Sequence, residues 1–152
     1  DVFNHLRVRG SWSYLNSGIR ELLTYSSSKY KISSGRQCFT MDAFLVTIAN
    51  GPEYGLGAKI APMASFDDAA LNLISVAPRN PVSLLLQSRR LFSGTIQRLP
   101  EVRFISSAAM EIFSDHPIKF HVDGEIYEGK ERLLVRVRPS SLCVRVPTAK
   151  RP

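Results

Sequence analysis

Cysteine is scarce in this sequence, and its scarcity excludes several kinds of site. The 152 residues include two cysteines, Cys38 and Cys143, which are far apart and form no C-x-x-C motif. Two cysteines are too few for a disulfide framework, and a metal site built on this distant pair is not expected. Both cysteines lie in apolar, strand-like runs. We therefore expect buried thiols in a reducing, cytoplasmic compartment.

Long apolar runs and the best-known catalytic glycine motifs are also missing. The longest apolar candidates, "AFLVTIA" and "LNLISVA", have the length of strands and fall far short of the roughly 18 residues of a membrane helix. No G-x-S-x-G elbow is present, so acyl transfer has no support. Gly55 and Gly57 do not begin a dinucleotide-binding G-x-G-x-x-G, because Ile60 occupies the third glycine position.

What is present is a globular composition with excess basic charge. Hydrophobic residues make up 44% and charged residues 22%, and 20 Lys and Arg against 13 Asp and Glu give a net charge of +7. We expect one domain over residues 1–147 and a tail over residues 148–152. The charge favours an anionic partner, such as nucleic acid, an acidic membrane surface or phosphate. Arg136, Arg138 and Arg145 alternate with apolar residues, which is typical of a solvated strand face.

Hydrophobic periodicity predicts a mainly β chain with two helices, in a β-sandwich-like (α+β) domain. The first helix is expected in "SWSYLNSGIRELLTYSS", with an apolar stripe of Trp12, Leu15, Ile19, Leu22 and Leu23. The second is expected to begin at Asn80-Pro81 and to end before Gly94, with a buried stripe of Val82, Leu85, Leu86 and Leu91. Strands are expected in "KYKI", "QCFTMDAFLVTIAN", "AKIAP", "LNLISVA", "VRFIS", "AAMEIF", "IKFHV", "EIY", "RLLVRVR" and "SLCVRV".

The stretch "FHVDGEIYEG" contains a candidate catalytic carboxylate. Asp123-Gly124 favours a type I′ hairpin turn, which makes Glu125 the first residue of the returning strand. Alternate spacing also allows His121, Asp123 and Glu125 to share one sheet face, where His121 could tune either carboxylate. Glu125 is then either a rigidly mounted general base or a solvated strand residue, and His121 is either its partner or a surface histidine.

The stretch "APMASFDDAAL" contains a candidate metal loop. Adjacent carboxylates such as Asp67 and Asp68 can hold Mg²⁺ when backbone carbonyls and water complete the coordination. The alternative is a turn in which one of the two side chains accepts hydrogen bonds from nearby backbone N–H groups. The local sequence pattern does not decide between a metal loop and a hydrogen-bonded turn.

Three elements in this order make the chain resemble the C-terminal domain of the diacylglycerol kinase and sphingosine kinase superfamily of lipid kinases. They are "FLVTIANGPEYGLGAKIAPMASFDDAALNLISV", then a helix, then "PIKFHVDGEIYEGKERLLVRVRPSSLCVRVP". The resemblance covers roughly residues 44–147. It implies a β-sandwich domain that forms one side of an active-site cleft, where the γ-phosphoryl group of ATP passes to a lipid hydroxyl. An NAD kinase-like domain is a nearer alternative, and a non-catalytic basic β domain that binds nucleic acid or an acidic partner is a more distant one.

The resemblance also implies roles for particular residues. Glu125 corresponds to the proposed general base, with Asp123 as a supporting carboxylate. Asp68 corresponds to the acidic residue of the Mg²⁺-associated loop, flanked by Ser65 and Ala70 where the family supplies backbone ligands. The family usually has glycine after that aspartate, whereas this chain has Ala69. A requirement for positive φ there would strain the alanine.

The chain also lacks the family's phosphate-binding motif. It has no Gly-Gly pair, so the Gly-Gly-Asp-Gly-Thr loop of the nucleotide-binding domain is missing, and the sequence begins at Asp1. We therefore interpret these residues as the second domain of a longer kinase, inactive without the domain that binds ATP. The expected partners are the lipid substrate, ATP, the N-terminal nucleotide-binding domain and, peripherally, an anionic membrane surface. Nucleic acid is not expected, and the oligomeric state, a homodimer included, is left open.

Overall fold

The computed structural model describes residues 27–35, 37–55, 57–78, 80, 83 and 86–145. Nine strands form the framework of this part of the chain, and every pair is antiparallel. A four-stranded sheet has the order β2-β1-β6-β9, from β1 Ser28–Ser34, β2 Gln37–Ala43, β6 Ala109–Ser114 and β9 Arg132–Arg136. A three-stranded sheet has the order β3-β4-β5, from β3 Leu45–Ala49, β4 Leu71–Val76 and β5 Val102–Ser107. A separate hairpin pairs β7 Lys119–Val122 with β8 Glu125–Glu128.

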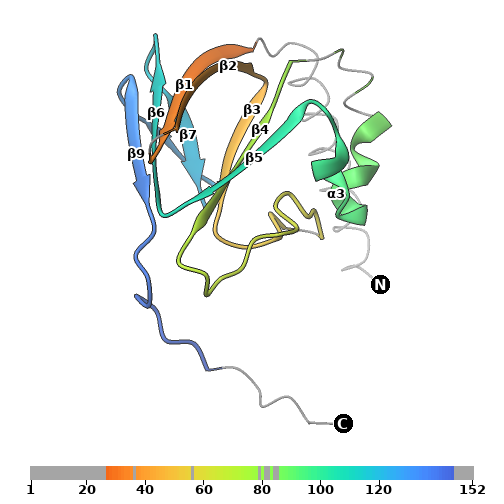
Figure 1. The fold of residues 1–152 in the computed structure, drawn as a ribbon, viewed down its shortest axis with the longest axis vertical. Coiled ribbons are helices and arrows are strands. Elements are labelled where there is room, and N and C mark those ends of the chain that lie inside the picture. Colours follow the sequence, from red (N-terminus) through yellow and green to blue (C-terminus); the bar gives the residue numbers. More distant parts are fainter. Residues whose placement is uncertain are drawn as a thin grey trace, which may run out of the picture.

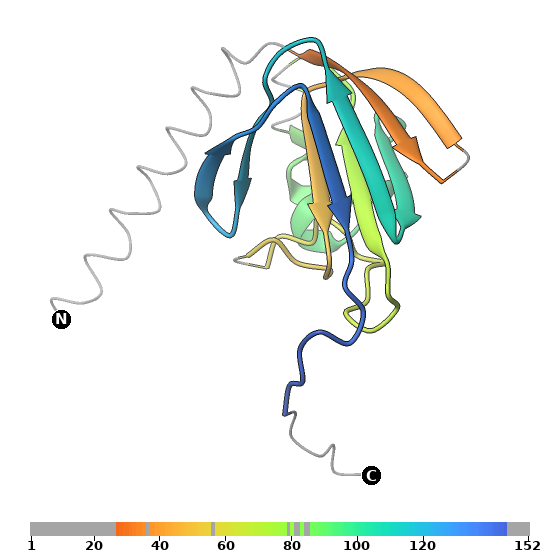
Figure 2. The same ribbon diagram turned by 90° about the vertical axis from the view of Figure 1, so that its left-hand side faces the viewer.

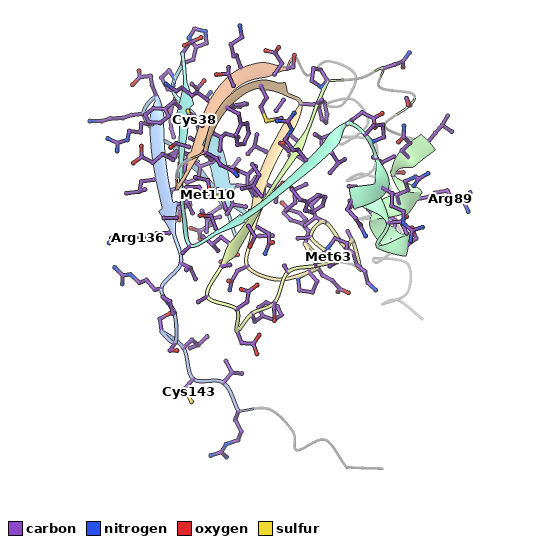
Figure 3. The ribbon with its side chains drawn as sticks, viewed as in Figure 1. Cys38, Met63, Arg89, Met110, Arg136 and Cys143 are labelled. Carbon is purple, nitrogen blue, oxygen red and sulfur yellow. The ribbon has the colours of Figure 1, made fainter. Side chains whose placement is uncertain are left out.

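The two larger sheets form a sandwich around a shared core. Ile32 of β1, Met110 of β6 and Leu73 of β4 belong to one buried cluster, and each is at most 1% exposed. Figure 1 shows the four-stranded sheet and the three-stranded sheet as separate layers, with the helical segment beyond the three-stranded one. Side chains crowd around Met110 between the layers (Figure 3). The predicted mainly β, sandwich-like class is therefore confirmed.

Strand β4 is buried on both faces, which explains its continuous apolar sequence. Leu71 and Leu73 face the sandwich core, whereas Ile74 joins a second cluster with Ile60, Ala61 and Ile96. Successive strand residues point to opposite faces, so only a strand covered on both sides can be apolar at consecutive positions. The cover on the second side comes from the loop that follows β3 and from the short helices that follow β4.

The predicted pair of helices is not supported. The first, with its apolar stripe from Trp12 to Leu23, lies outside the described residues. Within the range expected for the second, the described residues include Ser83, Leu86 and Gln87 as helical and the five-residue α3 Arg89–Ser93, and the 3₁₀ helix η1 Ile96–Arg98 follows. Gly94 ends α3 in the left-handed region at φ 65°, as its position predicted. Leu86, placed in a buried stripe, is instead 72% exposed.

Two predicted strands are also wrong. "AKIAP" forms no strand, because its backbone hydrogen bonds go to a helix and a loop: the Lys59 N–H donates to the Leu91 carbonyl of α3, and the Ala61 N–H donates to the Pro52 carbonyl. The described part of "SLCVRV" is likewise unpaired. It follows Pro139, which lacks an N–H, and Ser140, whose φ of 53° turns the chain away from the sheet.

Both cysteines are exposed, contrary to the expectation of buried thiols. Along β2, Phe39 and Met41 pack toward the core, so strand alternation points Cys38 outward. Cys143 lies on the extended segment beyond β9 (Figure 3). No helix in the part of the chain that the structure describes is long and apolar enough to cross a membrane.

Candidate active site

The hairpin β7–β8 holds the candidate base at its tip. Val122 pairs directly with Glu125, so the connection consists of Asp123 and Gly124 alone. Their φ angles are 50° and 91°, both positive as a type I′ turn requires. The predicted turn and the position of Glu125 as the first residue of β8 are therefore confirmed. Figure 2 shows this hairpin projecting from the sandwich.

The base of the hairpin is fixed to the core. The Gly129 N–H donates to the Ile118 carbonyl at 2.9 Å, and the Ile118 N–H donates to the Lys130 carbonyl at 3.2 Å. Ile118 is 8% exposed and belongs to the sandwich cluster. A buried anchor at one end and a two-residue turn at the other give Glu125 a defined position at an exposed rim.

The two faces of the hairpin carry different side chains, which corrects the expectation that His121 and Glu125 share one. Cross-strand partners point to the same face, so Val122 and Glu125 lie on one face and His121 and Ile126 on the other. A two-residue turn interrupts the alternation along the sequence, because it reverses the chain without continuing the pleat. His121 therefore does not lie beside Glu125.

The partner of Glu125 on its own face is Tyr127. The Tyr127 hydroxyl donates a hydrogen bond to Glu125 Oε2 at 2.7 Å. This bond, helped by partial desolvation and by the charge of Asp123, raises the pKa of Tyr127 above its ordinary value. Sequence reasoning missed Tyr127, although its position two residues after Glu125 on a strand was a sufficient signal.

His121 instead contacts the glycine-rich loop, which is the stretch "NGPEYGLG" at residues 50–57. Its Nε2 lies 3.1 Å from the Tyr54 hydroxyl, and the two rings meet edge to face with centroids 5.9 Å apart. Tyr54 is held by the tight turn of "YGLGA", in which the Tyr54 N–H donates to the Ala58 carbonyl. The glycine-rich loop therefore reaches the hairpin, which the sequence alone did not indicate.

The glycine-rich loop also touches the aspartate-rich loop, which is the stretch "MASFDDAA" at residues 63–70. A methyl group placed on Gly51 would lie 2.3 Å from two ring atoms of Phe66, so the ring packs directly against this glycine. Contacts of the glycine-rich loop thus join the loop of Asp68 to the hairpin of Glu125. Within the described residues, no hydrogen bond joins Asp68 to Glu125 directly.

The aspartate-rich loop has the turn geometry that was considered as the alternative to a metal loop. Asp68 Oδ1 accepts a hydrogen bond from the Ala70 N–H at 2.9 Å, and the Ser65 hydroxyl donates to Asp67 Oδ1. Ala69 has φ 55°, so the alanine adopts the left-handed conformation that suits glycine. Ala69 therefore occupies a position at which glycine would be unstrained.

The donor chemistry of this loop fits a largely hydrated Mg²⁺. Asp67 and Asp68 are exposed carboxylates, and hard oxygen ligands are what Mg²⁺ prefers. In the part of the chain that is described, no three His, Cys, Asp or Glu side chains gather as a metal site. Water and substrate phosphate would therefore have to supply most of the coordination.

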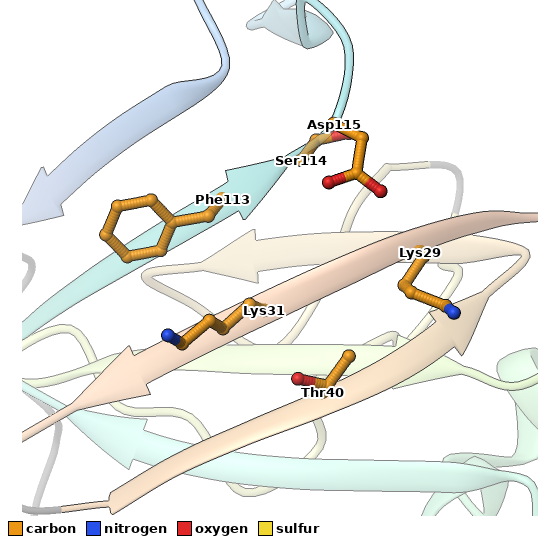
Figure 4. Close-up of a pocket in the computed structure, with 6 residues that line it drawn as sticks. All are labelled: Lys29, Lys31, Thr40, Phe113, Ser114 and Asp115. Carbon is orange, nitrogen blue, oxygen red and sulfur yellow. The ribbon is translucent and has the colours of Figure 1, made fainter.

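A separate concave surface lies over β1, away from these loops. Its volume is about 240 Å³, and its lining includes Lys29, Lys31 and Asp115 (Figure 4). Both lysines are on exposed strand positions, and the Asp115 carboxylate opposes the binding of an anion. We assign it no role.

The family model described as the YegS C-terminal NAD kinase beta sandwich-like domain matches residues 1–146. The chain therefore belongs to this family of domains, and the predicted resemblance to the C-terminal domain of the lipid kinase superfamily is confirmed.

Curated relatives carry lipid kinase names. A protein of Yersinia enterocolitica named "Probable lipid kinase YegS-like" is 29% identical over 140 residues, which are 92% of this chain and 46% of that protein. A Salmonella newport protein named "Probable lipid kinase YegS" is 30% identical over 140 residues, 91% of this chain and 44% of that protein. The chain thus spans less than half the length of these relatives.

Solved structures share the fold. A crystal structure of a diacylglycerol kinase from Bacillus anthracis strain Sterne has a TM-score of 0.54 at 16% identity, over 78% of this chain and 43% of that one. Another crystal structure from the same strain has a TM-score of 0.60 at 20% identity, over 85% of this chain and 47% of that one.

Proposed function

We propose that this chain is the lipid-facing half of an ATP- and Mg²⁺-dependent lipid kinase, acting on a hydroxyl of a diacylglycerol or sphingoid-type lipid. The family match over residues 1–146 and the lipid kinase names of the curated relatives support the class of enzyme. The observation that carries the site is Glu125, the first residue of β8 behind a two-residue turn, at an exposed rim that meets the glycine-rich loop.

The proposed role of Glu125 is that of a general base. As the lipid hydroxyl oxygen bonds to the γ-phosphorus, the bond from that phosphorus to the bridging oxygen of ATP breaks and ADP leaves. The hydroxyl proton passes to the Glu125 carboxylate, which must lie within about 2.6–3.2 Å of the hydroxyl. Asp123, one residue before the turn glycine, adds negative charge at the same tip and would support this transfer.

The proposed role of the aspartate-rich loop is to hold Mg²⁺. When bound, the ion would neutralise charge on the phosphates. Asp68 would supply a carboxylate ligand, and Ser65 and Ala70 would supply backbone carbonyls. The hydrogen bond from the Ala70 N–H to Asp68 Oδ1 already fixes the orientation of that carboxylate.

ATP would be held by a separate nucleotide-binding domain, since this chain has no Gly-Gly pair from which to build the phosphate loop. The net charge of +7 favours peripheral docking of the cytoplasmic enzyme on an anionic bilayer. Each Lys or Arg near such a surface contributes about 1 kcal/mol.

The decisive experiment substitutes Glu125→Gln in the enzyme that contains both domains. General-base catalysis contributes on the order of 10²-fold or more, so kcat with a lipid acceptor should fall by about that factor. Glu128→Gln is the matched control, because Glu128 is an exposed glutamate on the same strand but on the opposite face. Near-normal turnover of Glu125→Gln would remove the assignment. Comparing diacylglycerol, a sphingoid base, ceramide and phosphatidylglycerol as acceptors would identify the lipid.

The proposed role of Asp68 as a metal ligand is tested by the Mg²⁺ dependence of activity. Asp68→Asn should shift the Mg²⁺ concentration that gives half-maximal activity to a higher value, because one anionic ligand is lost. Asp42→Asn, at an exposed position on β2, is the control and should leave the Mg²⁺ dependence unchanged. If Asp68→Asn gives the wild-type titration curve, Asp68 is not a metal ligand.

A further inference from the structure

We propose that Tyr127 is the positioning residue for Glu125: its hydroxyl binds one carboxylate oxygen and leaves the other to accept the substrate proton. This inference rests on the proposed function, in which Glu125 is the base. Tyr127 lies outside the Asp-Gly-Glu motif, and its role follows from the geometry of this hairpin.

The first argument is the choice of oxygen. The Tyr127 hydroxyl donates to Glu125 Oε2 at 2.7 Å, a short bond of the kind formed with a charged acceptor. A glutamate on an exposed hairpin otherwise samples several rotamers of three side-chain torsions. One donor on the same face, two residues away, restricts that sampling and engages Oε2 rather than Oε1. A base must be held in this way to meet a hydroxyl at hydrogen-bond distance.

The second argument is that the ring of Tyr127 is itself held. It stacks on Phe120, its direct cross-strand partner, with centroids 5.7 Å apart and an interplanar angle of 21°. Phe120 in turn lies against Gly129, where an added methyl group would be 3.2 Å from Phe120 Cε1 and 2.9 Å from Leu133 Cδ2. Gly129 therefore admits the Phe120 ring beside Leu133, a partly buried side chain that packs against the sandwich core. Contacts thus run without a break from the core to the carboxylate.

The electrostatics agree with this arrangement. The hydrogen bond to Glu125 is the largest of the effects that raise the pKa of Tyr127, followed by partial desolvation and the charge of Asp123. The carboxylate therefore meets a protonated, donating hydroxyl throughout the neutral range. The acidic groups that face Tyr127 are Glu125 on its own strand and Asp123 in the turn, and its cross-strand neighbour Phe120 carries no charge.

The contact can be tested without measuring activity. The ¹³Cζ signal of Tyr127 in this chain is titrated between pH 8 and 12 in the wild type and in Glu125→Gln. Removal of the carboxylate charge should lower the pKa of Tyr127 toward the ordinary value of about 10. Glu128→Gln, on the opposite face of β8, should leave the titration unchanged. An unchanged titration in Glu125→Gln would overturn the inference, whatever Glu125 does in catalysis.

The positioning role is tested by kinetics in the enzyme with both domains. Tyr127→Phe keeps the stacked ring and removes only the hydroxyl, so kcat should fall about three- to tenfold, the range of one ordinary hydrogen bond. The KM values for ATP and lipid should stay unchanged, because substrate binding is not altered. Tyr30→Phe, which removes a hydroxyl from β1 in the four-stranded sheet, is the control and should keep the wild-type kcat.

The two proposals fail in different ways. If Glu125→Gln is inactive while Tyr127→Phe retains the wild-type kcat, Glu125 remains the base and the positioning role is wrong. If Glu125→Gln is fully active, the proposed base is wrong, and the positioning role falls with it even where the titration confirms the contact.

Discussion

Replacing Ala69 with glycine should stabilise the protein, although glycine substitutions usually destabilise. Ala69 is an exposed alanine with φ 55° in the aspartate-rich loop. An L-residue with a Cβ pays roughly 1–2 kcal/mol for the left-handed region, because Cβ approaches the following carbonyl oxygen. Glycine carries no such cost, so the substitution relieves local strain in the folded state.

The opposing effect acts on the unfolded chain. Glycine there has more accessible conformations than alanine, which favours unfolding by about 0.4–1 kcal/mol. The methyl group of Ala69 is exposed, so its loss removes little buried area. The difference of the two effects predicts a gain of about 0.5–1 kcal/mol in the free energy of unfolding. For a chain of this size, each kcal/mol raises Tm by roughly 2–4 °C.

Urea denaturation of the wild type and of Ala69→Gly measures this difference directly. Ala109→Gly is the matched control: Ala109 is also exposed, but it lies in β6, where glycine should cost about 0.5–1 kcal/mol. If Ala69→Gly is destabilised as much as Ala109→Gly, then Ala69 does not adopt positive φ in solution. The strain assigned to Ala69 would then be refuted.

Three further outcomes are expected. Leu73→Ala, at a fully buried position between the sheets, should lower the free energy of unfolding by about 2–5 kcal/mol. Leu134→Ala, at a 57% exposed position, should change it by about 0.5 kcal/mol or less. Similar losses in the two variants would contradict the sandwich core. Native protein should react with two equivalents of a thiol reagent, because Cys38 and Cys143 are exposed; a thiol that reacts only after denaturation would show that one of them is buried. The wild type should be more stable than Tyr127→Phe below the ordinary tyrosine pKa of about 10. This difference should disappear as pH rises through the raised pKa of folded Tyr127, because the phenolate cannot donate to Glu125. A difference that stays constant into strong alkali would contradict the hydrogen bond.

Local sequence determined the hairpin and most of the strands. Asp123-Gly124 is chemically suited to positive φ at two consecutive positions, so the turn and the position of Glu125 follow from four residues. The strands from Val102 to Glu128 could be predicted for a similar reason, because turn residues divide short β-rich runs at regular spacing. The family could also be predicted, since it depends on the order of short motifs along the chain.

Tertiary structure decided what those motifs contact. Tyr54 meets His121 across 67 positions in the sequence, and Gly51 packs against Phe66 from a different loop. No local pattern encodes these approaches, because they depend on how the loops cover β4 and on where the hairpin leaves the sandwich. The exposure of Cys38 and Leu86 was missed for the same reason: an apolar run shows that something is buried, whereas the direction of each side chain depends on its neighbours.

Glu125 shows most clearly what the sequence determined and what the tertiary structure decided. The sequence by itself determined that a carboxylate follows a tight turn, because turn conformation is a property of a few consecutive residues. The face on which that carboxylate lies, with Tyr127 beside it and His121 on the other side, was decided only when two strands paired across the turn. Pairing is a non-local interaction, and it sets the register that places side chains next to one another.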